Sequence, residues 1–551
     1  MKIKGFMIKK GIQCLKDYGP KELLVRVIER KKRQEIPYDA WYQTQKIDGA
    51  EWERQREESG KWECRPIVSI CVPLYKTPEK FLCEMIDSVR NQTYENWQLC
   101  LADGSPDLQL ESVIQNHYPE EKRICYRHLE ENLGIADNTN AAFALAEGEW
   151  IGLLDHDDIL APEALYESMK AALENAGEVE AVYSDEDKIT EDLVRHFDPH
   201  FKPDYNLDLL RSNNYITHFF VVKRTIVEQA GGFCKDFDGS QDYDFILRCT
   251  TKAKKTAHVP RILYHWRTSE NSTAENPASK MYAFEAGKRA VETHLQKEEI
   301  AAEVLYTKGL GFYRVKYQLQ GKPSVSIIKM DAKTTVDVLR ARIDEAENEY
   351  ILLLDAQIKQ PNEEEINELL SHCQQEQVAT IGPKIIDKKK KIYSAGRILG
   401  GERLVNEVYT GLPSHYYGYM HRASTQIAYS ALNPACVLIK KQAYQEVGGI
   451  SEAFTELKWA MLDLFLKFNE AGYRNVYTPY AEVVLENGTA SVVAGVVNET
   501  AMSNTTGGTI TSLRETADVQ LLLAQHKQLS RPDGCYNPNL SIEKADYTLN
   551  V

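Results

Sequence analysis

The chain has 551 residues, with 43% hydrophobic and 27% charged side chains and a formal net charge of −15 at pH 7. A chain this long exceeds what one hydrophobic core usually organises, so we expect two or three globular units. The acidic balance argues against a nucleic-acid binder, which needs a concentrated basic face. No apolar run in the sequence approaches the ~18 residues that a membrane-spanning helix requires.

The start of the sequence and the cysteines favour a cytoplasmic location. Lysines between residues 2 and 10 interrupt each apolar stretch that could form the core of a signal peptide. Eleven cysteines at irregular spacing include no CxxC pair, so we expect neither a disulfide framework nor a structural zinc site. Free cysteines are typical of a reducing compartment. We therefore predict a cytoplasmic protein.

The first region, residues 1–64, is predicted to be basic and helical. Residues 1–34 contain eleven Lys or Arg against three acids, an excess of +8, with Ile8, Ile12 and Leu15 at helical spacing. A basic amphipathic helix can lie on an anionic membrane surface, so residues 1–34 are a candidate for peripheral contact with the inner face of the membrane. A solvated helix docked on the next domain explains the same pattern, and both interpretations stay open.

Residues 65–297, called the first domain below, show a repeating alternation of strands and helices. Helical stretches such as residues 80–92 alternate with short apolar runs, at residues 67–75, 97–103, 150–158 and 180–187. This alternation predicts an α/β fold with a mixed, mostly parallel sheet and flanking helices. Ligands bind such sheets beyond the carboxyl ends of the strands, where acidic residues gather in this chain.

The second half of the chain indicates an internal repeat. Residues 347–358 (ENEYILLLDAQI) match residues 147–158 (EGEWIGLLDHDD), after a strand-like start at Pro323. We expect residues 298–322 to be a linker and residues 323–490, the second domain, to repeat the first. Residues 491–551 are expected to form a flexible linker and a C-terminal helix and tail.

Asp155-His156-Asp157 directly follows the predicted strand WIGLL. Two carboxylates at a sheet edge can hold a hard divalent cation through oxygen ligands, and that cation can bridge a diphosphate. Such a short string is weak by itself. Taken alone it favours a polar turn before the next helix, with Asp158 near the N-cap position.

The surrounding sequence favours the metal site over the polar turn, because six motifs occur together in order. They are VSICVPLY, Asp103-Gly104-Ser105, NLGIADNTNAAFALAEGEW, LLDHDD, GSQDYDFILR and YHWR. In this order and spacing the region resembles the family 2 glycosyltransferases with the GT-A fold. The resemblance implies a nucleotide-diphosphate-sugar donor, a divalent metal (Mn²⁺ or Mg²⁺) and inverting transfer. DGCYNPNLS near the end also resembles the closing signature of a tandem two-domain subfamily that assembles bacterial surface polysaccharides.

The resemblance also implies the donor-binding residues. Pro73, Leu74 and Tyr75 would line the base pocket, with Asp103 beside it, although Ala102 replaces a first Asp that family members commonly carry. The segment along the nucleotide-sugar contains Asn132, Gly134 and Asn140, for which turn chemistry and a helix start are the competing explanation. Further donor contacts are expected from four residues: Asp155, Asp185, Trp266 and Arg267. For Trp266 and Arg267, a buried tryptophan and an ordinary surface arginine remain the alternatives.

The chemistry is predicted to depend on four side chains. Asp242 matches the position of the family's general base, which accepts the proton of the attacking hydroxyl. Gln241 stands where many relatives have an acid. The metal is expected on Asp155, Asp157 and His265.

In the second domain Asp355-Ala356-Gln357 replaces the first domain's metal motif. Only about twenty residues, rather than about eighty, separate its first strand from the strand before that motif, so the nucleotide-binding strands are missing. We expect an inactive module that binds sugar or forms a homo-oligomer. The predicted function is transfer of a sugar to a growing surface polysaccharide or lipid-linked glycan precursor. The alternatives are an inactive glycan-binding scaffold and a hydrolase with paired carboxylates.

Overall fold

The computed structural model describes residues 38–174, 177–268, 281–486 and 516–550, together with seven isolated positions: Leu15, Pro20, Leu23, Leu24, Val27, Gly488 and Ala490. The predicted membrane contact of residues 1–34 and the predicted flexible part of 491–551 therefore lie largely outside the described residues. Within the described ranges, no helix has the length and apolar character needed to cross a membrane.

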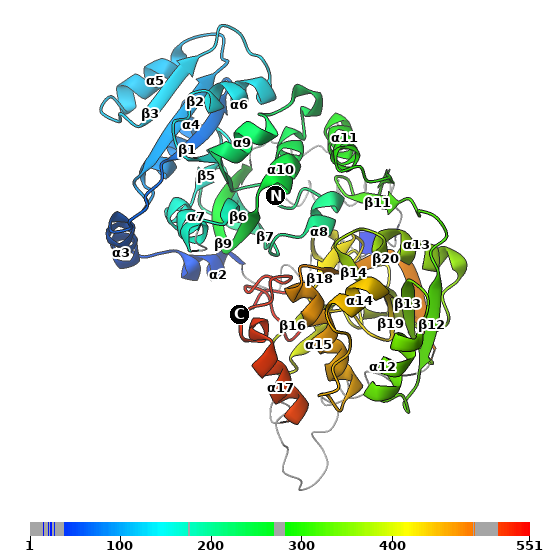
Figure 1. The fold of residues 1–551 in the computed structure, drawn as a ribbon. Coiled ribbons are helices and arrows are strands. Elements are labelled where there is room, and N and C mark those ends of the chain that lie inside the picture. Colours follow the sequence, from blue (N-terminus) through cyan, green and yellow to red (C-terminus); the bar gives the residue numbers. More distant parts are fainter. Residues whose placement is uncertain are drawn as a thin grey trace.

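The first domain is built on a nine-stranded sheet in the order β3-β2-β1-β4-β8-β6-β9-β5, with β7 paired to β6 (Figure 1). Strands β3, β2, β1 and β4 run parallel, β8 is antiparallel to both its neighbours, and β9 is parallel to β6. The bounds are β1 (Val68–Leu74), β2 (Trp97–Asp103), β3 (Ile124–His128), β4 (Trp150–Leu153), β5 (Ile159–Leu160), β6 (Val179–Thr190), β7 (His196–His200), β8 (Phe220–Lys223) and β9 (Lys255–Thr268).

Several helices cover this sheet with an apolar stripe. In α4 (Glu79–Arg90) the buried residues Leu82, Met85, Ile86 and Val89 follow the i, i+3, i+4, i+7 spacing of one helix face. The other helices are α2 (Tyr38–Gln45), α3 (Gly49–Gly60), α5 (Gln109–His117), α6 (Ile135–Phe143), α7 (Ala164–Leu173), α8 (Leu207–Ser212), α9 (Arg224–Ala230), α10 (Gln241–Lys252) and α11 (Met281–Lys297). The predicted α/β fold is therefore confirmed.

The second domain contains a seven-stranded mixed sheet in the order β12-β13-β19-β14-β20-β18, with β15 paired to β14. The pairings of β12, β13, β19, β14 and β20 reproduce those of β1, β4, β8, β6 and β9 in the same directions. The bounds are β12 (Val325–Met330), β13 (Tyr350–Asp355), β14 (Val378–Asp387), β15 (Ile392–Ser394), β18 (Ile427–Tyr429), β19 (Cys436–Lys440) and β20 (Arg474–Leu485).

The second sheet is shorter on the side where the first domain continues into β2 and β3. Only α12 (Val336–Glu345) lies between β12 and β13, so the second domain has no counterpart of β2 and β3 among its described strands. This agrees with the predicted truncated repeat. The domain also contains α13 (Glu363–Cys373), α14 (Lys441–Glu446), α15 (Leu457–Glu470) and a small hairpin of β16 (Arg397–Leu399) and β17 (Val405–Glu407).

The segment predicted as a linker, residues 298–322, contains a hairpin of β10 (Ala302–Tyr306) and β11 (Tyr313–Tyr317). Tyr313, Val315 and Tyr317 alternate along β11 and are all buried, because one face of the strand packs on α8 and α13. The segment is thus part of the packed structure between the two domains.

Buried polar contacts join the two domains. Asp208 in α8 lies 2.9 Å from Nε2 of His372 and 2.8 Å from Nε of Arg474, and both partners belong to the second domain. Burial alone would raise the pKa of the Asp208 carboxyl, but Arg474 and His372 hold it well below its usual range. The C-terminal tail, which includes α17 (Ala517–Gln525), lies against both domains (Figure 1).

Candidate active site

The Asp155–Asp158 turn joins β4 to β5 at the carboxyl end of the parallel strands. Asp155 is 51% exposed, Asp157 is half-buried, and Asp158 is fully buried. Asp158 accepts hydrogen bonds from the Tyr264 hydroxyl at 2.6 Å and from the backbone N–H of Arg267 at 2.7 Å. Glu163, not Asp158, occupies the N-cap position of α7. Asp158 therefore fixes the turn to β9 through hydrogen bonds. Asp155 and Asp157 are the two carboxylates of the turn that point outward.

Asp155 and Asp157 carry a negative charge that their protein neighbours relieve only in part. Burial raises the pKa of the Asp157 carboxyl, and the charge of Asp155 raises it further, against the opposing effect of His156 and Arg267. Two carboxylates so close in the chain, with the pKa of Asp157 raised, suit a hard divalent cation, which would offset their repulsion. The pair therefore fits the predicted metal.

The structure does not bring His265 to this pair. Its side chain is 4% exposed, with Nδ1 2.6 Å from Asp187 Oδ1 and Nε2 2.9 Å from the Tyr42 hydroxyl. Successive side chains of a strand point to opposite faces, and the neighbouring Tyr264 is the one that reaches Asp158. The predicted third metal ligand therefore needs correcting: both ring nitrogens of His265 are engaged elsewhere.

Asp187, His196 and His265 are the one set of three metal-ligand side chains whose ligand atoms lie within 4.8 Å of one another in the described part of the chain. Asp187 accepts from Nδ1 of both histidines, at 3.0 Å and 2.6 Å, and from the Tyr38 hydroxyl at 2.7 Å. This closed set of hydrogen bonds satisfies the carboxylate without a cation. It anchors α2, which carries Tyr38, to the sheet.

His218 is the histidine that lies beside the carboxylate pair. Its Nε2 is 3.8 Å from Asp155 Oδ2, its Nδ1 is 3.1 Å from Glu186 Oε2, and its ring stacks on Tyr264 with centroids 4.5 Å apart. Burial alone would lower the pKa of His218, but Glu186 and then Asp155 and Asp158 outweigh it and raise the pKa to about 9. Sequence reasoning missed His218. His218 lies just before β8, which runs antiparallel to β4, and this position is what brings it close to the turn that follows β4.

Asp242 lies in the first turn of α10 and receives a 2.8 Å hydrogen bond on Oδ2 from the side-chain amide of Asn214. Burial raises the pKa of this carboxyl, while the charge of His218 lowers it and that of Asp155 raises it. These mutual effects place Asp242 within electrostatic reach of the carboxylate pair. Asp244, two residues further on, instead forms a 2.6 Å ion pair with Arg248 of the same helix.

The residues predicted around the base lie at the ends of β1 and β2, which are in register. Tyr75 is 42% exposed and Pro73 is half-buried, so both remain accessible. Leu74 is fully buried in the core. Asp103 is also fully buried, and accepts from the backbone N–H of Ser105 at 2.8 Å and from the Tyr126 hydroxyl at 2.7 Å. The structure thus indicates that Leu74 and Asp103 support, from the protein interior, the residues of the predicted base pocket.

The segment that starts α6 is held by its own side chains. Asn132 Oδ1 accepts from the N–H of Gly134 and from the side chain of Asn138, at 3.1 Å and 2.9 Å. Gly134 has φ 92, a left-handed value that favours glycine. Asn140 bonds the backbone N–H and C=O of Phe233 at 2.8 Å and 2.9 Å. Asn132 stays exposed, whereas the side chain of Asn140 connects α6 by hydrogen bonds to the loop before α10.

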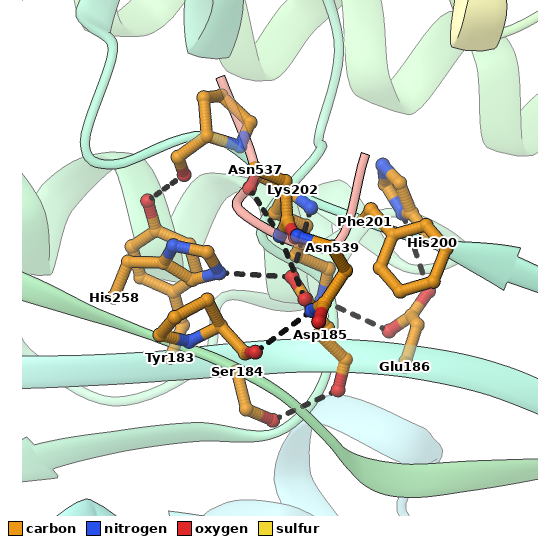
Figure 2. A network of polar contacts seen from close by, with 12 residues as sticks. Tyr183, Ser184, Asp185, Glu186, His200, Phe201, Lys202, His258, Asn537 and Asn539 are labelled. Carbon is orange, nitrogen blue, oxygen red and sulfur yellow. Dashed lines mark hydrogen bonds and ion pairs between the residues drawn. The ribbon is translucent and has the colours of Figure 1, made fainter. Parts of the chain in front are cut away.

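Asp185 is the centre of a buried polar network, and the predicted sugar contact needs correcting (Figure 2). It is fully buried, and its oxygens accept from the backbone N–H of Lys202 at 2.8 Å and from the Asn537 amide at 2.7 Å, with His258 Nε2 at 2.8 Å. Asn537 belongs to the C-terminal tail. Strand β6 therefore binds this chain's own C-terminal tail through Asp185.

Arg267 also differs from the prediction. Arg267 is 1% exposed, donates from Nε to the Asp157 backbone oxygen at 2.6 Å, and pairs with Glu84. Its buried side chain supports the backbone of the turn and is not exposed for the predicted donor contact. Trp266 is half-buried, with its ring centroid 6.2 Å from that of His218, so it remains next to the site.

Comparison with known proteins assigns a family to part of the chain. Residues 69–231 match the family model "Glycosyl transferase family 2". Uncharacterized protein y4gI of Sinorhizobium fredii is 30% identical over 88% of this chain and 59% of its own length. The O-antigen biosynthesis protein RfbC of Myxococcus xanthus is 27% identical over 88% of this chain and 41% of its length.

The chain thus spans 59% and 41% of the length of these two relatives. Among solved structures, mannosyltransferase PcManGT from Pyrobaculum calidifontis, in complex with GDP-Man and Mn²⁺, matches at 17% identity. That match covers 45% of this chain and 71% of PcManGT, with a TM-score of 0.32. The match to the family model alone places a family 2 glycosyltransferase domain at residues 69–231.

Proposed function

We propose that the chain is a metal-dependent, inverting glycosyltransferase of the GT-A type. One observation carries the proposal: within and just beyond the family 2 domain, an outward carboxylate pair, a histidine and a half-buried carboxylate lie within electrostatic reach of one another. These groups are Asp155 with Asp157, His218 and Asp242. Domain boundaries at 65–297 and 323–490 belong to the same proposal.

Asp242 would act as the general base. Its carboxylate would accept the proton of the acceptor hydroxyl while that oxygen attacks the anomeric carbon opposite the leaving nucleotide, so configuration inverts without a covalent intermediate. The Asn214 amide would hold the carboxylate in position through its 2.8 Å hydrogen bond. Trp266 and Tyr75 remain accessible for contacts with the sugar and the base.

Asp155 and Asp157 would hold a divalent cation, whose charge when bound stabilises the departing diphosphate. We assign the third ligand to His218 in place of His265. The hydrogen bond from its Nδ1 to Glu186 directs its Nε2 toward Asp155, the orientation that a second carboxylate gives to metal-binding histidines.

The donor would be a nucleotide-diphosphate-sugar and the acceptor a hydroxyl of a growing surface polysaccharide or lipid-linked precursor. The naming of the relative RfbC as an O-antigen biosynthesis protein supports this acceptor class. A location on the cytoplasmic side of the membrane is part of the proposal.

A glycan-binding function without transfer is the second candidate. A groove of about 890 Å³ in the second domain, between β11, α13 and β20, is lined by polar and aromatic side chains that include Arg314, Tyr480 and Glu482. Such a mixture of amide, charged and aromatic groups suits sugar hydroxyls and ring faces. This groove would let the second domain hold the growing glycan.

Isothermal titration calorimetry separates the two candidates. With uridine and guanosine diphosphates, with and without Mn²⁺, we expect binding that requires the metal, followed by donor hydrolysis for one nucleotide-sugar in a screen. Absence of any nucleotide binding would overturn the transferase. Binding of an oligosaccharide that Tyr480→Ala abolishes would then favour the binding module.

The pH dependence of transfer offers a test of Asp242 through its neighbour. The base must be ionised, and burial raises its pKa, so activity should fall as pH drops through a value above the ordinary ~3.9 of Asp. In Asn214→Ala the acidic limb should move to higher pH, because a hydrogen bond to the charged carboxylate is lost.

The matched control is Asn213→Ala, which removes an amide that bonds the Gly311 backbone instead. The acidic limb of the pH profile of Asn213→Ala should coincide with that of the wild type. Profiles of kcat against pH for the three proteins decide the question, and an unmoved limb in Asn214→Ala would show that this amide does not tune the base.

A further inference from the structure

Residues 213–218, between α8 and β8, form a loop that touches both halves of the proposed site. Asn214 at its start donates to Asp242, and His218 at its end faces Asp155. The distance between the proposed base and the proposed metal pair therefore depends on the shape of this loop.

The loop adopts a backbone conformation that its own sequence does not favour. Thr217 has φ 41, a left-handed value that is costly for a β-branched residue. Its hydroxyl donates to Glu186 Oε2 at 2.8 Å, and the same oxygen accepts from the backbone N–H of His218 at 3.1 Å. One carboxylate oxygen thus accepts hydrogen bonds from two consecutive residues of the loop.

Lys202 captures the loop from the other side of its backbone. Its Nζ donates to the carbonyl oxygen of Ile216 at 2.6 Å, to that of His218, and to Glu186 at 3.2 Å. Lys202 is fully buried and Glu186 is 7% exposed. Together they form a bracket, the Glu186–Lys202 pair, that holds residues 216–218 by backbone and side-chain atoms.

Stability alone does not account for this buried pair. The desolvation of two buried charges offsets most of their attraction, and apolar replacements of similar volume are often as stable. Apart from an ion pair of Glu186 with His200 Nδ1 at 3.5 Å, the contacts of both side chains converge on one strained loop. Figure 2 shows that the C-terminal tail adds to the bracket, since the Asn537 amide donates to the Lys202 carbonyl at 2.9 Å.

We propose that Glu186 and Lys202 are positioning residues that set the geometry between Asp242 and the Asp155–His218 side of the site by fixing the loop at residues 213–218. This inference rests on the proposed transferase function. Neither side chain touches substrate. Their effect reaches the chemistry through Asn214 and His218.

The test is a kinetic double-mutant cycle with Lys202→Met and Glu186→Gln, both close in size to the original side chains. At saturating Mn²⁺, each single variant should lower kcat by about 10- to 100-fold, as expected for misplaced catalytic groups, with donor KM within about threefold of wild type. The double variant should lose about as much as one single variant, because both residues act on the same loop.

Asp463→Asn is the matched control. Asp463 is a fully buried carboxylate of the second domain that pairs with Lys467 at 2.7 Å and His526 at 2.9 Å. Losing this pair removes a buried interaction of the same kind away from the loop, so kcat should remain that of the wild type. Equal kcat losses in Asp463→Asn and Lys202→Met would overturn the proposal.

Hydrogen–deuterium exchange keeps the inference separate from the proposed function. If wild type transfers no sugar from any donor, the transferase proposal fails, and the bracket is judged by exchange alone. Peptides covering residues 213–220 should then exchange at least about tenfold faster in Lys202→Met, while peptides of residues 325–355 stay unchanged. Unchanged exchange in residues 213–220 would overturn the bracket.

Discussion

The Asp242→Asn variant should bind donor and metal like the wild type and transfer sugar about 10² to 10⁴ times more slowly. Asparagine keeps the shape of the side chain but cannot accept the proton of the attacking hydroxyl. Single-turnover measurements with saturating donor isolate this step from binding and release.

Asp236→Asn provides the control, because Asp236 is an exposed carboxylate in the loop before α10. Its transfer rate should match the wild type. If Asp242→Asn transfers sugar as fast as that control, Asp242 is not the base, whatever its position.

The Asp157→Ala variant should lose metal-dependent nucleotide binding by at least about 100-fold, since loss of a mere supporting partner already costs 10- to 100-fold. In the wild type, a nucleotide diphosphate with Mn²⁺ at 100 times its Kd should stabilise the fold by about 2.7 kcal/mol. At the same nucleotide concentration that gain should fall to about 0.4 kcal/mol or less in Asp157→Ala. Thermal unfolding with and without Mn²⁺, together with calorimetry, measures both effects.

Glu228→Ala is the matched control, because it removes an exposed carboxylate on α9 that is 66% exposed and pairs only loosely, at 3.8 Å, with Arg224. It should keep the full Mn²⁺ response. An undiminished response in Asp157→Ala as well would place the cation elsewhere.

Local patterns in the sequence predicted the fold because they act over short distances. The apolar runs of β1 and β4, the helical stripe of α4 and the internal repeat each need only a few neighbouring residues to be recognised. The turn at Asp155 was predictable for the same reason, since a strand end locates it, whereas Asp242 was singled out by the resemblance to the family.

Side-chain direction and distant pairing were harder to predict. His265 was expected at the metal, but the alternation of β9 turns Tyr264 toward that side and His265 toward Asp187. His218 became visible only once β8 was known to run antiparallel to β4. The role of Asp185 depends on Asn537, which is 352 residues away, and no local pattern predicts a pairing over that distance.

The pairing of Asp185 with Asn537 also has a consequence for how the protein is made. The two partners are 352 residues apart, so at about 5 to 20 residues per second the ribosome supplies the amide roughly 20 to 70 s after the carboxylate. Throughout that interval the Asp185 carboxylate has only its partners in the first domain, the Lys202 backbone N–H and His258. The Asp185 network is therefore completed late in translation, after the second domain has been synthesised.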